Sequence, residues 1–347
     1  MDIEIWQRLL SLESRDVVSR WFQMLHKNDL NARRAKEIIS SAKQAREFFK
    51  SASGASHAVR PLLAFYGVAS LSRALALLFR KNGGEEGLAK GHGLETVGWS
   101  DRLSGDLGQA IAGIGELRVR TSGGLFSDLV TETKNRIALH VNSEVVDWRL
   151  DYDVPALGHE FALLDILDRL PDVRRQFAHL ERDMRYVDLN EITYTTEAGV
   201  SLKVDAEGLK HFRSEFTDAG YSIAEQGKMA VITADAACFS KHTPQFLHTY
   251  VHKMFETIPH LHLVSQFGPG KQYSQIAVTY VLAYFLGMLA RYYPTHWTAL
   301  MTGEKGDALW PSINAAQHYV EIAFPELVLE FIEDALKTIE PKVHGSE

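Results

Sequence analysis

The chain has 347 residues, of which 46% are hydrophobic and 23% are charged, and its formal net charge is −7. This composition is typical of globular proteins and excludes a disordered or fibrous chain. The acidic excess argues against a protein that coats nucleic acid non-specifically, because neutralising phosphates needs clustered positive charge. A small basic pocket on an acidic body is still compatible with it.

Helical periodicity dominates the first part of the chain. Residues 31–50 predict an amphipathic helix, and residues 57–79 predict a longer, apolar one that tolerates Pro61 only in its first turn. Gly54 predicts a turn between them. Residues 83–124 are dense in glycine and predict a long irregular loop, a feature that is often functional. Helical character returns in residues 156–180, on either side of Pro171.

The middle of the chain changes its period. Residues 186–194 and 200–204 alternate by two and predict a hairpin, and residues 221–233 predict a second one. Between the hairpins, Asp205 can cap a short helix over residues 206–218. Beyond Cys238 the chain is predicted to be helical, over the ranges 244–257, 273–293 and 312–336, with Pro325 kinking or splitting the last helix.

The expected fold is therefore mainly α, a helical bundle with a small α+β insert of order strand-strand-helix-strand-strand. We expect an N-terminal helical part with the glycine-rich loop in residues 1–180, the insert in residues 181–236, and a C-terminal helical part in residues 237–347 that completes the bundle. Residues 272–290 carry no formal charge, but polar side chains and three tyrosines interrupt them. They predict a buried core helix rather than a membrane span.

One cysteine, Cys238, cannot form an internal disulfide or a cysteine-rich zinc site, which favours a reducing compartment. Asp2 and Glu4 precede any apolar stretch, which is unlike a secretory signal. These features predict a cytoplasmic protein.

Arg291 and His296 form the first candidate site, at the end of the most apolar helix. A guanidinium can hold a phosphate through two parallel hydrogen bonds, and a histidine can move a proton near neutral pH. Cleavage of RNA through its own 2′-hydroxyl needs only such groups and no metal. The alternative is structural: Arg291 neutralises a helix C-terminus, and His296 packs a corner with Trp297 after the break at Pro294.

His92, between Gly91 and Gly93, is the second candidate. Glycines let the backbone approach a ligand closely, and a histidine there could act on it. The surrounding glycines match neither the phosphate-binding loop of nucleotide hydrolases nor the dinucleotide fingerprint. A surface turn or hinge is the alternative.

The third candidate is a histidine cluster, which comprises His242, His248, His252, His260 and His262. His248 and His252 are spaced as zinc ligands on one helical face. Thr249 stands where a zinc protease would have glutamate, so histidines at a helix interface are the favoured interpretation and no metal is expected.

Several short motifs are similar to those of a known family. Pro61–Gly67 followed by Ser70–Ala74, then Gly91–Leu94, and the late segment Leu289–Trp297 together resemble the YaaC-like family of bacterial proteins. The resemblance spans most of the chain outside the first 30 residues and the tail. The family name implies no particular reaction.

A more distant likeness is to HEPN domains, the helical bundles of prokaryotic toxin and antiviral systems. Active members are metal-independent ribonucleases with an arginine followed about four to six residues later by a histidine, usually paired across a dimer. Arg291 and His296 match this spacing, whereas Tyr292 and Pro294 depart from the motif. The departures also favour an inactive bundle that binds a partner.

The leading hypothesis is a HEPN-like, metal-independent endoribonuclease or RNA-directed effector of a bacterial defence or toxin system. Arg291 would hold the scissile phosphate, His296 would be the general acid or base, and His92 would contribute from the glycine-rich loop, in a symmetric homodimer without a cofactor. The alternative is a non-catalytic adaptor whose insert or helical faces bind a partner protein of such a system. A third hypothesis is a small-molecule or nucleotide sensor that uses the glycine-rich loop.

Overall fold

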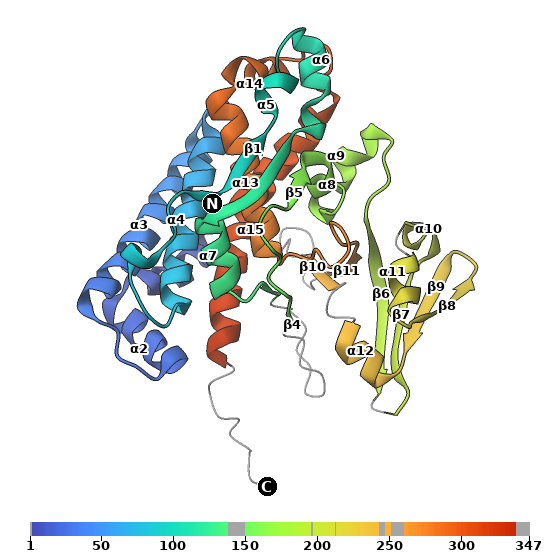
Figure 1. The fold of residues 1–347 in the computed structure, drawn as a ribbon, viewed down its shortest axis with the longest axis horizontal. Helices are drawn as coiled ribbons and strands as arrows, with labels where there is room; N and C mark the ends of the chain where they lie inside the picture. Colours follow the sequence, from blue (N-terminus) through green and yellow to red (C-terminus); the bar gives the residue numbers. More distant parts are fainter. Residues whose placement is uncertain are drawn as a thin grey trace.

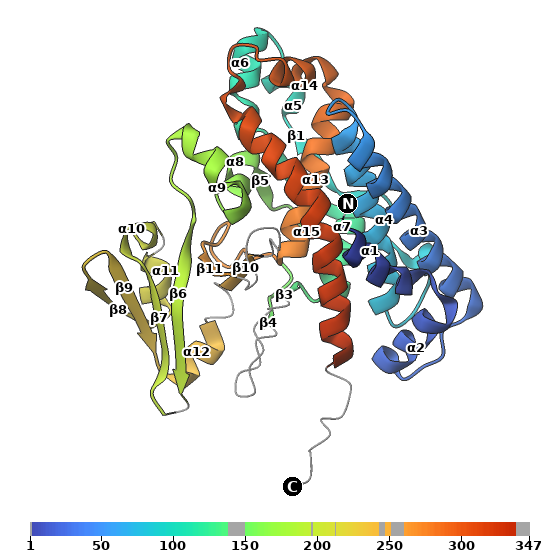
Figure 2. The ribbon, with the colours of Figure 1, turned by 180° about the vertical axis from the view of Figure 1, so that it is seen from behind.

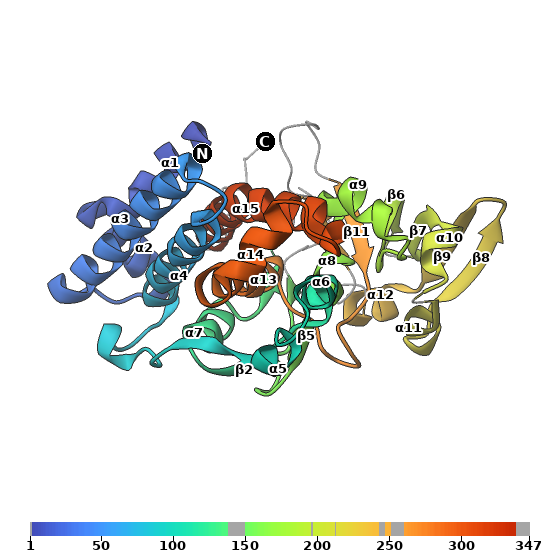
Figure 3. The same cartoon turned by 90° about the horizontal axis from the view of Figure 1, so that it is seen from above.

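The computed structural model describes residues 2–137, 150–195, 197–211, 213–242, 247–250 and 260–337. The described chain is mainly α-helical, as predicted, with small antiparallel sheets (Figure 1). Viewed from above, the N-terminal helices lie on one side, the C-terminal helices in the middle, and the largest sheet on the far side (Figure 3).

The N-terminal helices are α1 (Ile3–Leu9), α2 (Arg15–His26), α3 (Ala32–Gly54) and α4 (Arg60–Phe79). The two predicted helices in this region are thus confirmed, with Pro61 at the second residue of α4. The turn predicted over residues 51–56 begins only after Gly54, because Ala52 is buried and extends the apolar face of α3 to that glycine.

Helices α3 and α4 pack antiparallel, side by side (Figure 1). Near the start of α3, the buried guanidinium of Arg34 donates hydrogen bonds to the carbonyl oxygens of Leu77, Arg80 and Lys81 at the end of α4. The last carbonyls of a helix lack partners within the helix, so Arg34 satisfies them and fixes the register of the pair. Burial lowers the pKa of this guanidinium from its usual value.

The prediction of an irregular loop over residues 83–124 is wrong. This region contains β1 (His92–Val97), α5 (Trp99–Arg102), α6 (Leu107–Ala112) and β2 (Arg118–Gly124). The two strands pair antiparallel, and β2 also pairs with β5 (Glu160–Ala162). The glycines serve the ends of these strands: Gly91 and Gly93 have positive φ angles of 87° and 79°. The high glycine content of residues 83–124 is therefore explained by backbone conformation and close packing rather than by disorder.

The chain continues through α7 (Leu125–Glu132), β3 (Arg136–Ile137), β4 (Leu150–Asp151), β5, α8 (Leu163–Leu167) and α9 (Arg174–Phe177). Helical structure was predicted over residues 156–180, and the structure confirms it only after β5. Short 3₁₀ turns at 171–173 and 178–180 flank α9, so Pro171 divides this stretch as expected.

The α+β insert has the predicted order. It consists of β6 (Tyr186–Thr195), β7 (Gly199–Asp205), α10 (Ala206–Leu209), α11 (Arg213–Asp218), β8 (Ser222–Gln226) and β9 (Met229–Ala234). The side chain of Asp205 caps α10 by accepting a hydrogen bond from the backbone of Gly208 at 3.3 Å. A hydrophobic core separate from the main one fills the insert.

After the insert, α12 (Ala236–His242) leads to β10 (Leu247–Tyr250) and β11 (His260–Val264). The helix predicted over residues 244–257 is therefore wrong at 247–250. These residues pair with β11, which pairs in turn with β6, so the sheet has the order β10-β11-β6-β7-β9-β8. Backbone pairing with an existing sheet overrides the local helical preference. Residues 243–246 and 251–259 lie outside the described part.

The C-terminal helices are α13 (Gln275–Tyr292), α14 (Pro294–Met301) and α15 (Trp310–Lys337). Every residue of α13 from Gln275 to Ala290 is buried, which confirms the predicted core helix. Pro294 ends α13, and α14 turns away from it by 104°. Pro325 lies inside α15 without splitting it. Seen from behind, α15 runs beside α1, where Arg8 forms an ion pair with Glu333 (Figure 2).

Among the described helices, α4 is long and apolar enough to cross a membrane, and α13 and α14 pass the same test only as a bent pair. Of the most apolar window of α4, 72% is buried inside the protein. A helix buried in a protein core has the same composition, so these helices are accounted for by packing.

Candidate functional site

A pocket of about 480 Å³ lies where α3, α4 and the start of β1 meet. Its walls include Tyr66, Ser70 and Arg73 from α4, Gln44 and Phe48 from α3, and His92 from β1. The volume is in the range of small-molecule sites. The pocket thus contains one of the histidines that the sequence singled out, together with an arginine.

The backbone around His92 is fixed from two sides. The hydroxyl of Tyr280 in α13 donates a hydrogen bond to the His92 carbonyl oxygen at 2.9 Å, and the Leu125 amide donates to the Gly91 carbonyl at 3.0 Å. A Cβ atom on Gly93 would lie 2.7 Å from the backbone nitrogen of Phe126, so only glycine fits there. The glycines beside His92 therefore set its position at the pocket wall.

The imidazole of His92 packs edge-on against Phe65, with 5.0 Å between the ring centroids. Burial lowers the pKa of His92 below its usual value, and the charges of Arg291 and Arg73 lower it further. The ring is therefore neutral at pH 7 and can accept a proton. Within the part of the chain that the structure describes, neither ring nitrogen has a hydrogen-bond partner.

Two arginines lie close enough to this histidine for their charges to lower its pKa. Arg73 is half-buried at the pocket wall and has no carboxylate partner among the described residues. Arg291, the last basic residue of α13, donates a hydrogen bond from Nη1 to the hydroxyl of Tyr66 at 2.7 Å. Its guanidinium also lies over the Tyr292 ring, 4.9 Å from the centroid. By contrast, Arg60 at the start of α4 and Arg80 just after its end are paired with carboxylates.

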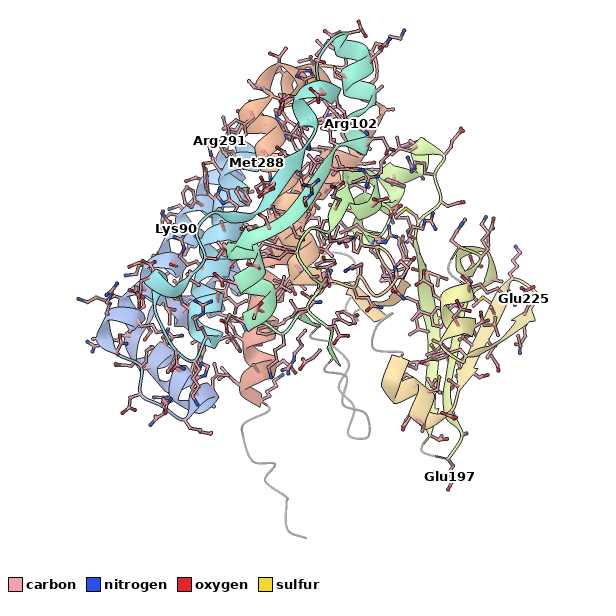
Figure 4. The ribbon with its side chains drawn as sticks, in the orientation of Figure 1. Lys90, Arg102, Glu197, Glu225, Met288 and Arg291 are labelled. Atoms are coloured by element: carbon pink, nitrogen blue, oxygen red, sulfur yellow. The ribbon has the colours of Figure 1, made fainter. Side chains whose placement is uncertain are left out.

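Arg291 is exposed, and the side-chain view shows it on the same side of the molecule as α3, α4 and Lys90, the residue that precedes Gly91 (Figure 4). Arg102 lies nearer to α6 in that view (Figure 4). The basic groups on this side of the molecule therefore come from α4, α13 and the segment before β1.

The structure gives His296 different neighbours from those of Arg291. The Nε2 atom of His296 is 2.9 Å from the carbonyl oxygen of Leu103, just after α5, and its ring contacts Tyr293. Helices α13 and α14 meet at a bend of 104°, and the two side chains have different hydrogen-bond partners. Trp297, next to His296, is buried against Trp310. The contacts therefore place His92, rather than His296, in the surroundings of Arg291.

The histidine cluster gains no support as a helical metal site. His248 belongs to β10, where it is paired in register with His262 of β11, and His252 lies outside the described residues. His262 is buried, and its Nδ1 is 2.9 Å from a carboxylate oxygen of Asp188. In the described ranges no group of three or more histidine, cysteine, aspartate or glutamate side chains could hold a metal ion.

No functional role is predicted from the sequence for the residues that α3 and α4 contribute to the pocket. Arg73 is the only charged residue in 61–79, an otherwise apolar stretch, and this isolation was a usable signal. Gln44 and Phe48 are four residues apart on α3, but nothing in the sequence shows that this face meets Ser70 and Tyr66.

A family model described as YaaC-like Protein matches residues 11–332. The chain therefore belongs to the YaaC-like family, as its motifs indicated. No curated protein and no solved structure matches it.

Proposed function

We propose that this member of the YaaC-like family binds a phosphate of RNA in the pocket at His92 and cleaves the neighbouring phosphodiester bond without a metal. The observation that carries the proposal is the pairing of a neutral histidine with two arginines, Arg73 and Arg291, that have no carboxylate partners in the described part of the chain. An anion is the missing counter-charge for such a group.

The reaction needs three kinds of group. Neutral His92 takes the proton from the ribose 2′-hydroxyl, and the 2′-oxygen then forms a bond to phosphorus. The bond from phosphorus to the 5′-oxygen breaks, and the leaving oxygen takes a proton from water. Arg73 and Arg291 hold the phosphate oxygens as their negative charge grows. The products are a 2′,3′-cyclic phosphate and a 5′-hydroxyl.

This proposal keeps the RNA substrate of the sequence-based hypothesis but transfers the proton to His92 instead of His296. His296 is hydrogen-bonded to the backbone carbonyl of Leu103, and its ring contacts Tyr293, which suits a packing role. The HEPN likeness, the homodimer and a partner protein stay predictions.

The test is cleavage of an end-labelled single-stranded RNA in the presence of a chelator. We expect His92→Gln and Arg73→Ala to lose about 100-fold or more of the rate, as for other general-base and phosphate-binding groups. Arg102→Ala is the control, because Arg102 is an exposed arginine outside the pocket walls. His296→Gln should cleave like the parent. Loss of cleavage in His296→Gln but not in His92→Gln would overturn the assignment.

The adaptor hypothesis predicts a different result. If Arg291 is structural, Arg291→Ala should lower the melting temperature. If it binds phosphate, Arg291→Ala should change the melting temperature little, because Arg291 is exposed and its hydrogen bond to Tyr66 contributes little to stability. Under the adaptor hypothesis the parent protein would also leave RNA intact.

A further inference from the structure

The pocket has a second region that differs from its basic end. Gln44 and Phe48 lie one helical turn apart on α3 and face Ser70 and Tyr66 of α4. The Ser70 hydroxyl donates a hydrogen bond to Oε1 of Gln44 at 3.1 Å. The rings of Phe48 and Tyr66 are in contact, with centroids 5.4 Å apart and planes inclined by 30°. An amide–hydroxyl pair and an aromatic pair thus share one pocket wall.

Gln44, Phe48 and Tyr66 are accessible to a ligand, and the Ser70 side chain is buried beside them. Gln44 is exposed, and Phe48 and Tyr66 are half-buried, whereas the adjacent Phe49 and Phe65 are fully buried in the core. Because its oxygen accepts from Ser70, the amide of Gln44 has both N–H donors free within the described part of the chain. Ser70 keeps lone pairs as acceptors. The wall therefore offers adjacent donor and acceptor groups next to an accessible aromatic ring.

From this arrangement we infer that Gln44, Ser70 and Phe48 form a nucleobase subsite that confines the substrate to single-stranded RNA. This inference rests on the proposed function, since it places the base of the nucleotide whose phosphate meets Arg73 and Arg291. Phe48 stacks on the base, and the Gln44–Ser70 pair bonds to its polar edge. A base inside a duplex has neither its face nor its pairing edge free, so only an unpaired base enters.

Equilibrium binding of small ligands tests the subsite separately from catalysis. The ligands are the four nucleoside 5′-monophosphates and ribose 5-phosphate, which carries the phosphate and sugar but no base. We expect the nucleotide that binds best to bind about 10-fold more tightly than ribose 5-phosphate, a typical contribution of stacking with hydrogen bonding. Gln44→Ala and Phe48→Ala should each remove most of this preference and leave the affinity for ribose 5-phosphate within about 2-fold.

The matched control is Lys43→Ala, which changes an exposed neighbour on the same helix and should retain the preference. If Phe48→Ala does not fold, Phe48→Leu keeps apolar volume and removes the ring, and it should show the same loss. Equal affinity of the parent for ribose 5-phosphate and all nucleotides would overturn the subsite while leaving phosphate binding intact. Absence of binding by every ligand would overturn the phosphate site, and with it the proposed function.

Discussion

The hydroxyl of Tyr66 accepts a hydrogen bond from Nη1 of Arg291 at 2.7 Å, and this bond joins α4 to the end of α13 across 225 residues of chain. Arg291 is thereby held beside the pocket by a neutral partner. A carboxylate would have neutralised the guanidinium, whereas a hydroxyl positions it and leaves its charge for a ligand.

Replacing Tyr66 by phenylalanine should weaken phosphate binding without unfolding the protein. The ring and its contact with Phe48 are kept, and only the bond that positions Arg291 is lost. We expect inorganic pyrophosphate to bind about 2- to 5-fold more weakly, in line with the net contribution of one hydrogen bond at an exposed site. Isothermal titration of the parent and Tyr66→Phe provides the measurement, and equal affinities would show that Tyr66 does not position Arg291.

The rate of RNA cleavage should depend on pH through His92. The pKa of this histidine lies below its usual value of 6.5, so the rate should rise with pH through that lowered pKa and be level by about pH 7. Arg73→Ala removes one positive charge that lowers the pKa. Its residual rate should therefore reach the plateau at a higher pH than that of the parent. Identical pH profiles would contradict the link between Arg73 and His92.

Arg34 should be important for stability, unlike the adjacent Arg33. Arg34→Ala leaves the end carbonyls of α4 without their donor, so we expect a loss of about 3 kcal/mol in the free energy of unfolding. Arg33→Ala removes the ion pairs that an exposed guanidinium forms with Glu37 and Glu86 and should cost less than about 1 kcal/mol. Urea denaturation of the two variants checks this difference, and similar losses would contradict the capping role.

Gly93→Ala and Gly91→Ala should differ because their surroundings differ. Both residues have positive φ, so alanine at either position costs about 1–2 kcal/mol. A Cβ atom at Gly93 also meets the backbone of Phe126 at 2.7 Å, whereas one at Gly91 meets nothing within 4 Å. Gly93→Ala should therefore be the less stable variant in thermal melts, and it should displace His92 and weaken ligand binding as well. Equal melting temperatures of the two variants would show that the Phe126 backbone moves to make room for the Cβ atom.

His159 should make the fold less stable in acid. It stacks on Tyr273 and bonds to its hydroxyl at 3.0 Å, and burial lowers the pKa of His159 to about 4. In the unfolded chain the histidine binds a proton below about pH 6.5, whereas in the folded protein it does so only near pH 4.

The unfolding free energy should thus be unaffected by His159 above about pH 6.5 and fall by about 2 kcal/mol as the pH drops toward about 4. His159→Gln should show less of this loss than the parent in the same range of pH. If the unfolding free energies of the parent and His159→Gln fall in parallel with pH, His159 is not the group that causes the loss.

The sequence was most informative where its period was long and regular. The apolar run of α4 and α13 predicted two core helices, and alternation by two predicted the hairpins of β6–β7 and β8–β9. It failed where tertiary pairing decides: residues 247–250 become a strand because β11 is available beside them. Glycine density in 83–124 marked strand ends and close backbone contacts and was misinterpreted as a loop.

The candidate site was predicted only in part. His92 and Arg291 were singled out for their residue types, but their proximity depends on how α13 packs against α4, which no local spacing encodes. Five residues of separation suggested that Arg291 and His296 act together, yet on either side of the bend at Pro294 Arg291 bonds to Tyr66 and His296 to the Leu103 carbonyl. Chain distance is a poor guide wherever a proline redirects the backbone.

Because α13 packs against α4 and its Tyr280 bonds to the His92 carbonyl, His92 is fixed at the pocket only after residues 275–292 have been synthesised. During translation the N-terminal helices leave the ribosome with their apolar faces exposed. These faces stay exposed until the insert, which has a separate hydrophobic core, and then α13 have been synthesised. Chaperone demand should consequently concentrate on the nascent N-terminal half, and truncations that stop short of residue 275 should aggregate.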